Sequence, residues 1–107
     1  MTYQEIFTML QETNIPVAYN FFTEPPGLPF IVFTYPNNDD FLADNKNYVE
    51  IVNVNIQLYT ERKSITTERI LENVLKAHDL TYTKASLWLE SEEMNETEYE
   101  SEILINE

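Results

Sequence analysis

The chain of 107 residues fits one domain, and its 43% hydrophobic content favours a packed core over disorder. Six Lys and Arg against 19 Asp and Glu give a formal net charge of -13 at pH 7, which disfavours tight binding to nucleic-acid phosphates. Because the sequence has no cysteine, disulfides, thiolate nucleophiles and zinc-thiolate sites are excluded. The first five residues lack the basic and apolar pattern of a signal peptide, and no stretch approaches the roughly 20 apolar residues of a membrane span. We expect a soluble protein made in a cytoplasm.

The N-terminal part of the chain predicts a short helix and a first strand. Thr2 and Glu5 have the spacing of a capping box, and apolar residues then recur at helical spacing, so we expect a helix over about residues 3–12. Val17 to Phe22 is apolar and aromatic enough for a strand. The proline-rich segment 24–29 that follows predicts a tight connection.

Two further strands are predicted on either side of a polar excursion. Phe30 to Tyr35 has the β-branched and aromatic composition of a strand covered on both faces, and Pro36 to Asp40 is expected to end it. Phe41 to Tyr48 is mixed and polar, which indicates an irregular excursion or a short edge strand. From 52 to 58, apolar residues at even positions alternate with Asn or Gln at odd positions, so we expect a strand with one packed face and one wet face.

The C-terminal half predicts a helix followed by a hairpin. Ser64 can cap a helix whose apolar stripe is formed by Ile70, Leu71, Val74 and Leu75. The residues expected on its solvent side are Glu68, Arg69, Glu72, Asn73 and Lys76. Two strand-like stretches, 82–90 and 96–105, are joined by a short polar turn and predict a closing hairpin.

The order of these elements predicts one α+β domain over residues 1–107. It has a mostly antiparallel sheet, two helices packed against it and a closing C-terminal β-hairpin. No segment repeats internally, and no linker is indicated.

Residues with catalytic potential are few. The single histidine, His78, falls near the C-terminal end of the second helix, where a structural role is favoured. With Gly27 as the only glycine, neither a Walker loop nor a dinucleotide fingerprint can be written, and no nucleophile-elbow motif is present. We expect no enzyme, no catalytic residues, no cofactor and no metal site.

The last strand carries a regular acidic pattern, in which every second residue is a glutamate. The members of this acidic stripe are Glu96, Glu98, Glu100 and Glu102. In a regular strand their carboxylates project from one face at intervals of about 7 Å. That spacing suits a solvated face, or a stripe with a role in an assembly, better than the converging ligands of one cation.

Four apolar side chains are candidates for exposure, either as core and loop anchors or as binding hot spots. They are Phe41, Leu42, Tyr48 and Trp88.

Three short stretches carry a resemblance to a known family. They are Phe41 to Tyr48, Ile56 to Thr60, and the hairpin, in which Leu89-Glu90-Ser91-Glu92 is followed by a Met and then by Tyr99-Glu100. In order and spacing the chain resembles small tail proteins of long-tailed phages and prophages of Gram-positive bacteria. The matching order extends from the first helix to the last strand.

The resemblance implies a role in virion assembly. Proteins of this kind are tail terminators, also called tail completion proteins, which form a six-fold ring on the end of the tail tube. The ring stops polymerisation of the tube protein and presents a surface to the neck proteins that join head and tail. The implied location is the virion tail, assembled in the host cytoplasm, and the implied fold is again α+β.

Two hypotheses connect these residues with a ring. The polar excursion is long enough to reach a neighbouring subunit, and the residues proposed for that contact are Asp39, Asp40, Phe41, Leu42, Asp44 and Lys46. If the acidic stripe faced the lumen, its charge would keep passing DNA from sticking to the wall.

Two other functions remain open. An acidic DNA mimic could block a basic groove of a nucleic-acid-binding protein, although the charge is weighted toward the half of the chain after Glu61. A head-tail connector or neck protein would share the small size and the α+β content.

Overall fold

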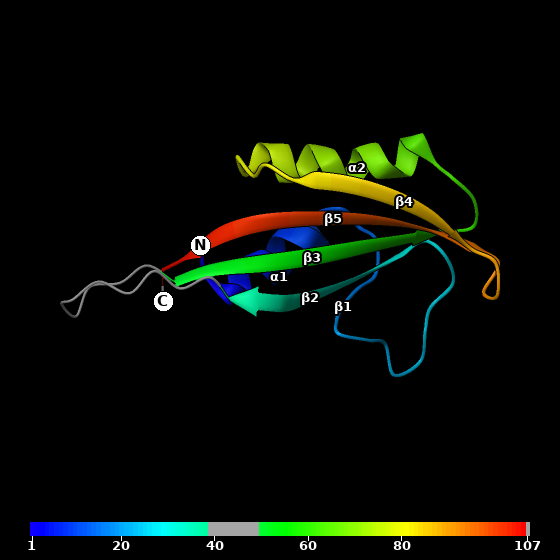
Figure 1. Cartoon of the computed structure of the whole chain (residues 1–107), viewed down its shortest axis with the longest axis horizontal. Coiled ribbons are helices and arrows are strands. Elements are labelled where there is room, and N and C mark those ends of the chain that lie inside the picture. Colours follow the sequence, from blue (N-terminus) through cyan, green and yellow to red (C-terminus); the bar gives the residue numbers. More distant parts are fainter. Residues whose placement is uncertain (39–49, 107) are drawn as a thin grey trace.

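Two helices and five strands make up the described part of the chain, which in this computed structural model covers residues 1–38 and 50–106. In chain order they are α1 (Tyr3–Gln11), β1 (Val17–Tyr19), β2 (Phe30–Asn38), β3 (Glu50–Thr60), α2 (Ile65–Ala77), β4 (Thr83–Leu89) and β5 (Met94–Ile105). The strands form one sheet in the order β1-β2-β3-β5-β4, in which only β1 and β2 run parallel (Figure 1). This arrangement confirms the predicted α+β class, with a mostly antiparallel sheet, two helices and a closing β4–β5 hairpin.

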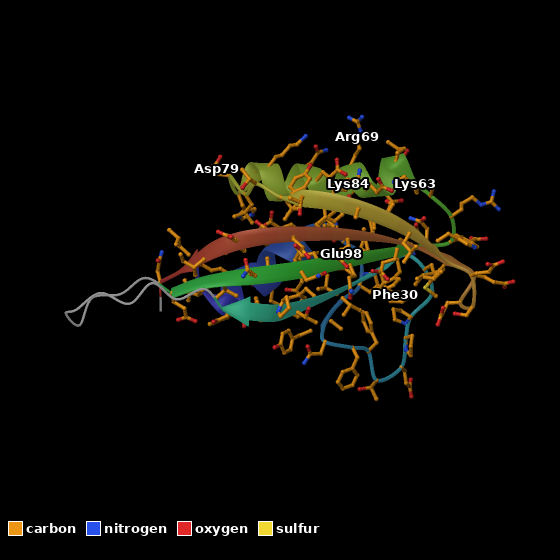
Figure 2. All side chains as sticks on the ribbon, in the orientation of Figure 1. Phe30, Lys63, Arg69, Asp79, Lys84 and Glu98 are labelled. Atoms are coloured by element: carbon orange, nitrogen blue, oxygen red, sulfur yellow. The ribbon has the colours of Figure 1, made fainter. Side chains whose placement is uncertain are left out.

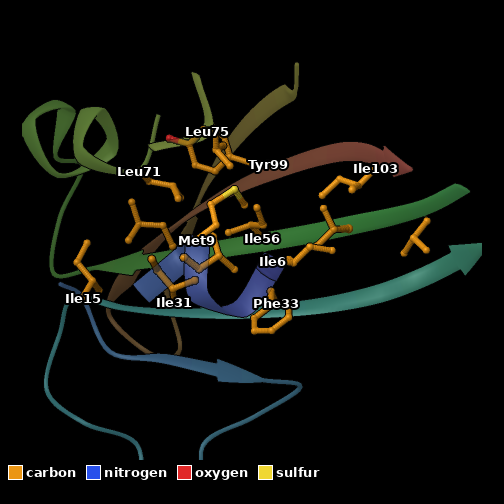
Figure 3. Close-up of a cluster of buried hydrophobic side chains, with 14 of the residues drawn as sticks. Ile6, Met9, Ile15, Ile31, Phe33, Ile56, Leu71, Leu75, Tyr99 and Ile103 are labelled. Atoms are coloured by element: carbon orange, nitrogen blue, oxygen red, sulfur yellow. The ribbon is translucent and has the colours of Figure 1, made fainter. Parts of the chain in front are cut away.

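The core lies between the helices and one face of the sheet. On β3 the buried side chains stand at even positions from 52 to 60, and on β5 they stand at odd positions from 95 to 105. Ile6 and Met9 of α1 and Leu71 and Leu75 of α2 pack between the layers, with Tyr99 of β5 among them (Figure 3). All five of these side chains are fully buried, so the strand alternation decides which face of the sheet the helices cover.

The N-terminal helix begins at the predicted capping box. The Thr2 hydroxyl accepts a hydrogen bond from the Glu5 amide at 3.0 Å, and the Glu5 carboxylate accepts one from the Thr2 amide at 2.8 Å. Two of the four amides that a helix start leaves unpaired are thereby satisfied. After Gln11 the chain leaves the helix, and Asn14 adopts a left-handed conformation with φ 61°.

The first two strands differ in length from the prediction. The first is shorter, because Asn20 has a φ of 67°, which is incompatible with an extended strand through Phe22. The second is longer, because β2 continues past Pro36 to Asn38. A register shift between Thr34 and Asn37 accommodates the proline, whose nitrogen cannot donate to the ladder.

The second helix begins where it was predicted, but the prediction of its buried and exposed residues was partly wrong. Ser64 caps it by accepting a hydrogen bond from the Thr67 amide at 3.2 Å. Ile70, expected in the apolar stripe, is 42% exposed, and Glu68, expected in solvent, is fully buried. The buried face of α2 therefore includes Glu68 and leaves out Ile70, because the sheet beneath the helix supplies partners for the Glu68 carboxylate.

Candidate functional site

The sheet face opposite the helices carries the acidic stripe. The residues that alternate with it on β5, from Asn95 to Ile105, are buried on the helix side. The four glutamates therefore project from one face, as the alternation predicts. Glu96 and Glu98 are half-buried, whereas Glu100 and Glu102 are exposed.

Each carboxylate of the stripe lies opposite an uncharged polar residue of β3. The paired residues are Tyr59 with Glu96, Gln57 with Glu98, Asn55 with Glu100 and Asn53 with Glu102. On the other side, β4 places only Thr83, Ala85 and Leu87 opposite the stripe. No basic residue of the neighbouring strands neutralises the stripe, because Lys84 of β4 points to the helix side of the sheet.

The surroundings of the acidic stripe differ between its two ends. At one end Glu96 adjoins Tyr59, whose ring packs against Phe30 with centroids 5.1 Å apart. Burial and the nearby charge of Glu98 raise the pKa of Glu96. Burial, and then the charge of Glu96, raise the pKa of Tyr59 to about 12. At the other end Glu100 and Glu102 stand in solvent beside a polar hollow of about 390 Å³ that Asn53, Thr81 and Thr83 also line.

These groups can repel anions and accept hydrogen bonds. Within residues 1–38 and 50–106, no three histidine, aspartate or glutamate side chains converge as a metal site would require. The described helices also include none that is long and apolar enough to cross a membrane. His78 ends α2 and its ring lies 3.1 Å from the Glu12 carboxylate, so it links the C-terminal ends of the two helices.

A network of charges, which we call the α2 clamp, holds the second helix to the sheet. Glu68, whose side chain is 1% exposed, binds Lys63 at 2.9 Å and Lys84 at 2.7 Å. Lys84 also binds Glu72 at 2.7 Å, and Tyr99 donates its hydroxyl to the same Glu72 oxygen at 2.7 Å. The clamp residues are Lys63, Glu68, Glu72, Lys84 and Tyr99; Figure 2 shows both lysines beside α2 and β4.

The clamp fixes its carboxyl groups in the charged form. Burial alone would raise the pKa of Glu68, but hydrogen bonds from Lys84 and Lys63 outweigh it and hold that pKa below the usual value. The pKa of Glu72 is also lowered, since Lys84 and Tyr99 offset its burial. The two carboxylates in turn raise the pKa of Lys84. The sequence pattern missed this site because Lys84 reaches Glu68 from a strand that follows the helix.

The basic side chains are unevenly distributed among the described residues. Residues 1–38 carry three acidic side chains and no Lys or Arg. Five basic side chains lie from Arg62 to Lys84, in a segment that from Glu61 onward also carries four acidic ones, and the hairpin turn after β4 adds Glu90, Glu92 and Glu93. Figure 2 shows Lys63, Arg69 and Lys84 together at the α2 side, away from Phe30. The basic residues are therefore gathered around α2, where nearby carboxylates largely balance them.

Aromatic residues gather between α1 and the first strands. The rings of Tyr19 and Tyr35 lie 5.5 Å apart, and the rings of Phe7 and Phe33 lie 5.8 Å apart. With Tyr3 and Gln4 they line a hollow of about 520 Å³. Tyr19 remains 49% exposed, and Phe21, just beyond β1, is 69% exposed.

Of the residues predicted to be exposed or to form the inter-subunit loop, only Trp88 lies in the described part of the chain. Trp88 is exposed, at 49%, on β4. The proposed inter-subunit loop, formed by Asp39, Asp40, Phe41, Leu42, Asp44 and Lys46, lies outside the described residues, as does Tyr48.

Comparison with known proteins identifies a shared fold. No protein-family model matches the sequence, and no curated protein matches it. A chain in the solved structure of the "Virion of native gene transfer agent (GTA) particle" superposes with a TM-score of 0.62 at 11% sequence identity. The match covers 95% of this chain and 90% of that chain, so the similarity extends over the whole fold.

Proposed function

We propose that this chain is a structural protein of a phage-like virion and, more specifically, the tail terminator that ends the tail tube. The observation that carries the proposal is the shared fold with a chain of a gene transfer agent virion over 95% of this chain. The order of tail-protein motifs, from Phe41 to the Tyr99-Glu100 pair, supports the finer role independently of that likeness.

The acidic stripe suits the wall of a channel through which DNA passes. Its four carboxylates stand on the sheet face that neither helix covers, and Glu100 and Glu102 are exposed there. DNA carries a negative charge about every 1.7 Å of its axis, so such a wall repels it at short range. In the proposed ring the stripe faces the lumen, and DNA moves past without tight binding.

The proposed partners follow from that position. The chain assembles with further copies of itself into a ring, proposed as a hexamer, in the virion tail. One face of the ring contacts the tail tube protein, and the other contacts the neck protein. Assembly takes place in the host cytoplasm without a membrane partner or a cofactor, and the chain acts as a single terminator domain rather than as an enzyme.

The cluster of basic residues around α2 disfavours the DNA-mimic alternative. A mimic of a phosphate backbone should present negative charge over much of its surface, whereas here five basic residues gather between Arg62 and Lys84. A neck connector fits the same fold likeness, since the matched structure is a whole virion particle. A terminator and a connector are distinguished by their binding partner, which is the tail tube for the first and the head vertex for the second.

Tube growth in the presence of the purified protein tests the proposal. Tail tube protein is allowed to polymerise with and without this chain, and tube lengths and ends are imaged by electron microscopy. We expect shorter tubes, each closed at one end by a ring. Tubes of unchanged length and bare ends, with the protein on the head vertex instead, would support the connector and overturn the terminator.

The position of the stripe is tested by the same images. A map of the ring is expected to show Glu98, Glu100 and Glu102 on the inner wall. Replacing these three by glutamine should increase retention of DNA in the rings at low salt. The matched control is the same change at Glu90, Glu92 and Glu93 of the hairpin turn, which should leave retention unchanged. A stripe on the outer wall would contradict the lumen role.

A further inference from the structure

A groove crosses the hairpin end of the sheet, on the face that carries the acidic stripe. Val32 of β2, Tyr59 of β3 and Met94 of β5 line it, and all three stand on this face because they follow the same alternation as the stripe. Phe21, just after β1, and Glu92, in the turn between β4 and β5, also line it. The groove therefore runs between two connecting segments of the chain, across the strands that separate them.

The lining of the groove is mostly apolar and aromatic. The Phe22 ring packs against Phe30 with centroids 5.4 Å apart, and Phe30 packs against Tyr59 at 5.1 Å, so the segment after β1 is fixed to the sheet here. Figure 2 shows Phe30 at this end of the sheet, away from α2. The volume of about 360 Å³ is at the small end of the range of about 300–1,000 Å³ that is usual for ligand pockets. It suits a few side chains rather than a folded domain.

The charged groups at the groove are carboxylates. Glu92 lines it, and Glu96 stands opposite Tyr59 on the same face. The Ser91 hydroxyl donates a hydrogen bond to Glu92. Among the described residues, no Lys or Arg lines the groove, and no ion pair includes Glu92, Glu96 or Glu98. These carboxylates therefore have no cationic partner within the described part of the chain.

Glu96 stands where its charge is disfavoured. Burial, and then the charge of Glu98, raise the pKa of Glu96, and only a hydrogen bond with Tyr59 acts in the other direction. An opposite charge within about 4–6 Å favours the charged form of a carboxyl group. A lysine or arginine that approaches the groove is therefore attracted to a half-buried carboxylate, where water and salt screen the attraction least.

The chemistry of the groove distinguishes between possible occupants. The carboxylates at its border repel the phosphates of nucleic acid. A second copy of this chain carries a net charge of -13, its Lys63 and Lys84 are already bound to Glu68, and its Arg62 lines another hollow together with Glu61. A basic segment of a different protein meets neither obstacle.

We propose that this groove docks a segment of another protein in which apolar side chains are flanked by lysine or arginine. The apolar side chains pack on the aromatic lining, and the cations pair with Glu92 and Glu96. Burial of apolar groups supplies affinity, while the complementary charges select the partner. The inference goes beyond the proposed function, because it holds whether the chain ends a tail tube or joins a head vertex.

Short peptides test the chemistry of the occupant. The probe is acetyl-Lys-Leu-Phe-Leu-Lys-amide, titrated into the isotope-labelled full chain at low salt and followed by NMR. We expect saturable shifts of the backbone amides that border the groove, with a Kd below about 1 mM. Replacing both lysines of the probe by glutamate, or its apolar centre by Ser-Gly-Ser, should weaken binding by about 10-fold or more. Equal binding of either altered peptide, no binding up to about 5 mM probe, or shifts confined to another surface would overturn the proposal.

Paired glutamine variants separate the groove from the overall charge. Glu92→Gln with Glu96→Gln removes two carboxylates at the groove and should weaken probe binding by about 5-fold or more. The matched control is Glu100→Gln with Glu102→Gln, which removes two carboxylates from the far end of the same strand face and should change the Kd by less than about 2-fold. An equal loss in both pairs would mean that only net charge attracts the probe.

A second pair of variants tests the apolar lining. Phe21→Ser removes an exposed aromatic ring from the groove and should weaken probe binding by about 5-fold. Leu104→Ser is the control, because Leu104 is 55% exposed on the same sheet face but pairs with Ile51 at the other end of β3. Circular dichroism establishes that each variant is folded. Unchanged binding by Phe21→Ser protein would contradict the assigned site.

The outcomes also identify other occupants and separate this inference from the proposed function. Self-association of the wild type that is lost in the Glu92→Gln, Glu96→Gln protein would mean that a second copy fills the groove, which overturns the inference. Groove shifts caused by a DNA oligonucleotide would overturn it as well. Failure of the probe to bind leaves the terminator role standing, because capping of tail tubes is measured separately. Probe binding by a protein that leaves tubes uncapped would support the inference and overturn the terminator.

Discussion

Replacing Lys84 by methionine should remove the central cation of the α2 clamp while preserving most of the side-chain volume. Glu68 would keep only Lys63, at 2.9 Å, as its cationic partner, and Glu72 would keep the Tyr99 hydroxyl. Removing one partner of a buried ion pair costs about 3–5 kcal/mol, because it leaves a buried charge uncompensated. Since the Lys84 side chain is itself 33% exposed and Lys63 still compensates Glu68 in part, we expect a smaller loss of about 2–3 kcal/mol. In urea unfolding followed by circular dichroism, this corresponds to a midpoint lower by about 1–2 M.

The pH dependence gives the sharper test. The wild-type pKa of Glu68 lies below 4.5, so the contribution of its charge to stability is present above pH 4.5 and is lost as the pH falls through the folded-state pKa. Without Lys84, burial should raise that pKa, and the variant should regain part of its deficit in acid. The stability difference should therefore be largest near neutral pH and shrink as the pH falls through the raised pKa of Glu68 in the variant and then through its lowered pKa in the wild type.

Two control variants isolate the clamp from other effects. Lys76→Met removes an exposed cation from the same helix and should change stability by no more than about 0.5 kcal/mol. Glu68→Met combined with Lys84→Met removes both charges and should be more stable than Lys84→Met alone. A double variant as unstable as Lys84→Met, or a stability difference that does not change with pH, would refute this account of the clamp.

Three further predictions concern local features. Thr2→Ala should lose about 1 kcal/mol in thermal unfolding because it removes the cap of α1, while Thr2→Ser should retain it. Asn55→Val should be neutral or stabilising in the same assay, because the Asn55 side-chain oxygen is buried without a hydrogen-bond partner in the described part of the chain; a loss above about 1 kcal/mol would contradict this. The raised pKa of Tyr59, about 12 against an ordinary 10.0, should leave stability unaffected by this group below pH 10 and reduce it between pH 10 and 12. An ultraviolet titration should show that step in wild type and not in Tyr59→Phe.

Features that depend on neighbours in the sequence were predictable. The capping box of Thr2 and Glu5, the alternation along β3 and the acidic alternation along β5 all need only local spacing, and all three occur in the structure. The order of elements and the closing hairpin followed from the same patterns. Spacing was sufficient because α1, β3 and β5 each bury one face only, which leaves a clear period in the sequence.

Features that depend on distant residues were not predictable. The continuation of β2 past Pro36 depends on β3, which pairs with Asn37 and Asn38 after the register shift. Glu68 was expected in solvent because an acidic residue in a helix is usually exposed. It is buried because the sheet order places Lys84, from a later strand, beneath α2.

Trp88 gives the protein an optical reporter at a useful place. It is the single tryptophan of the chain and stands half-exposed at the β4 edge. Indole emission shifts to shorter wavelength when water leaves the ring, so burial of this edge would change the colour and the quenching of the intrinsic fluorescence. Events at the β4 edge can therefore be followed in an unlabelled, unmodified chain, even in mixtures, provided the other components lack tryptophan.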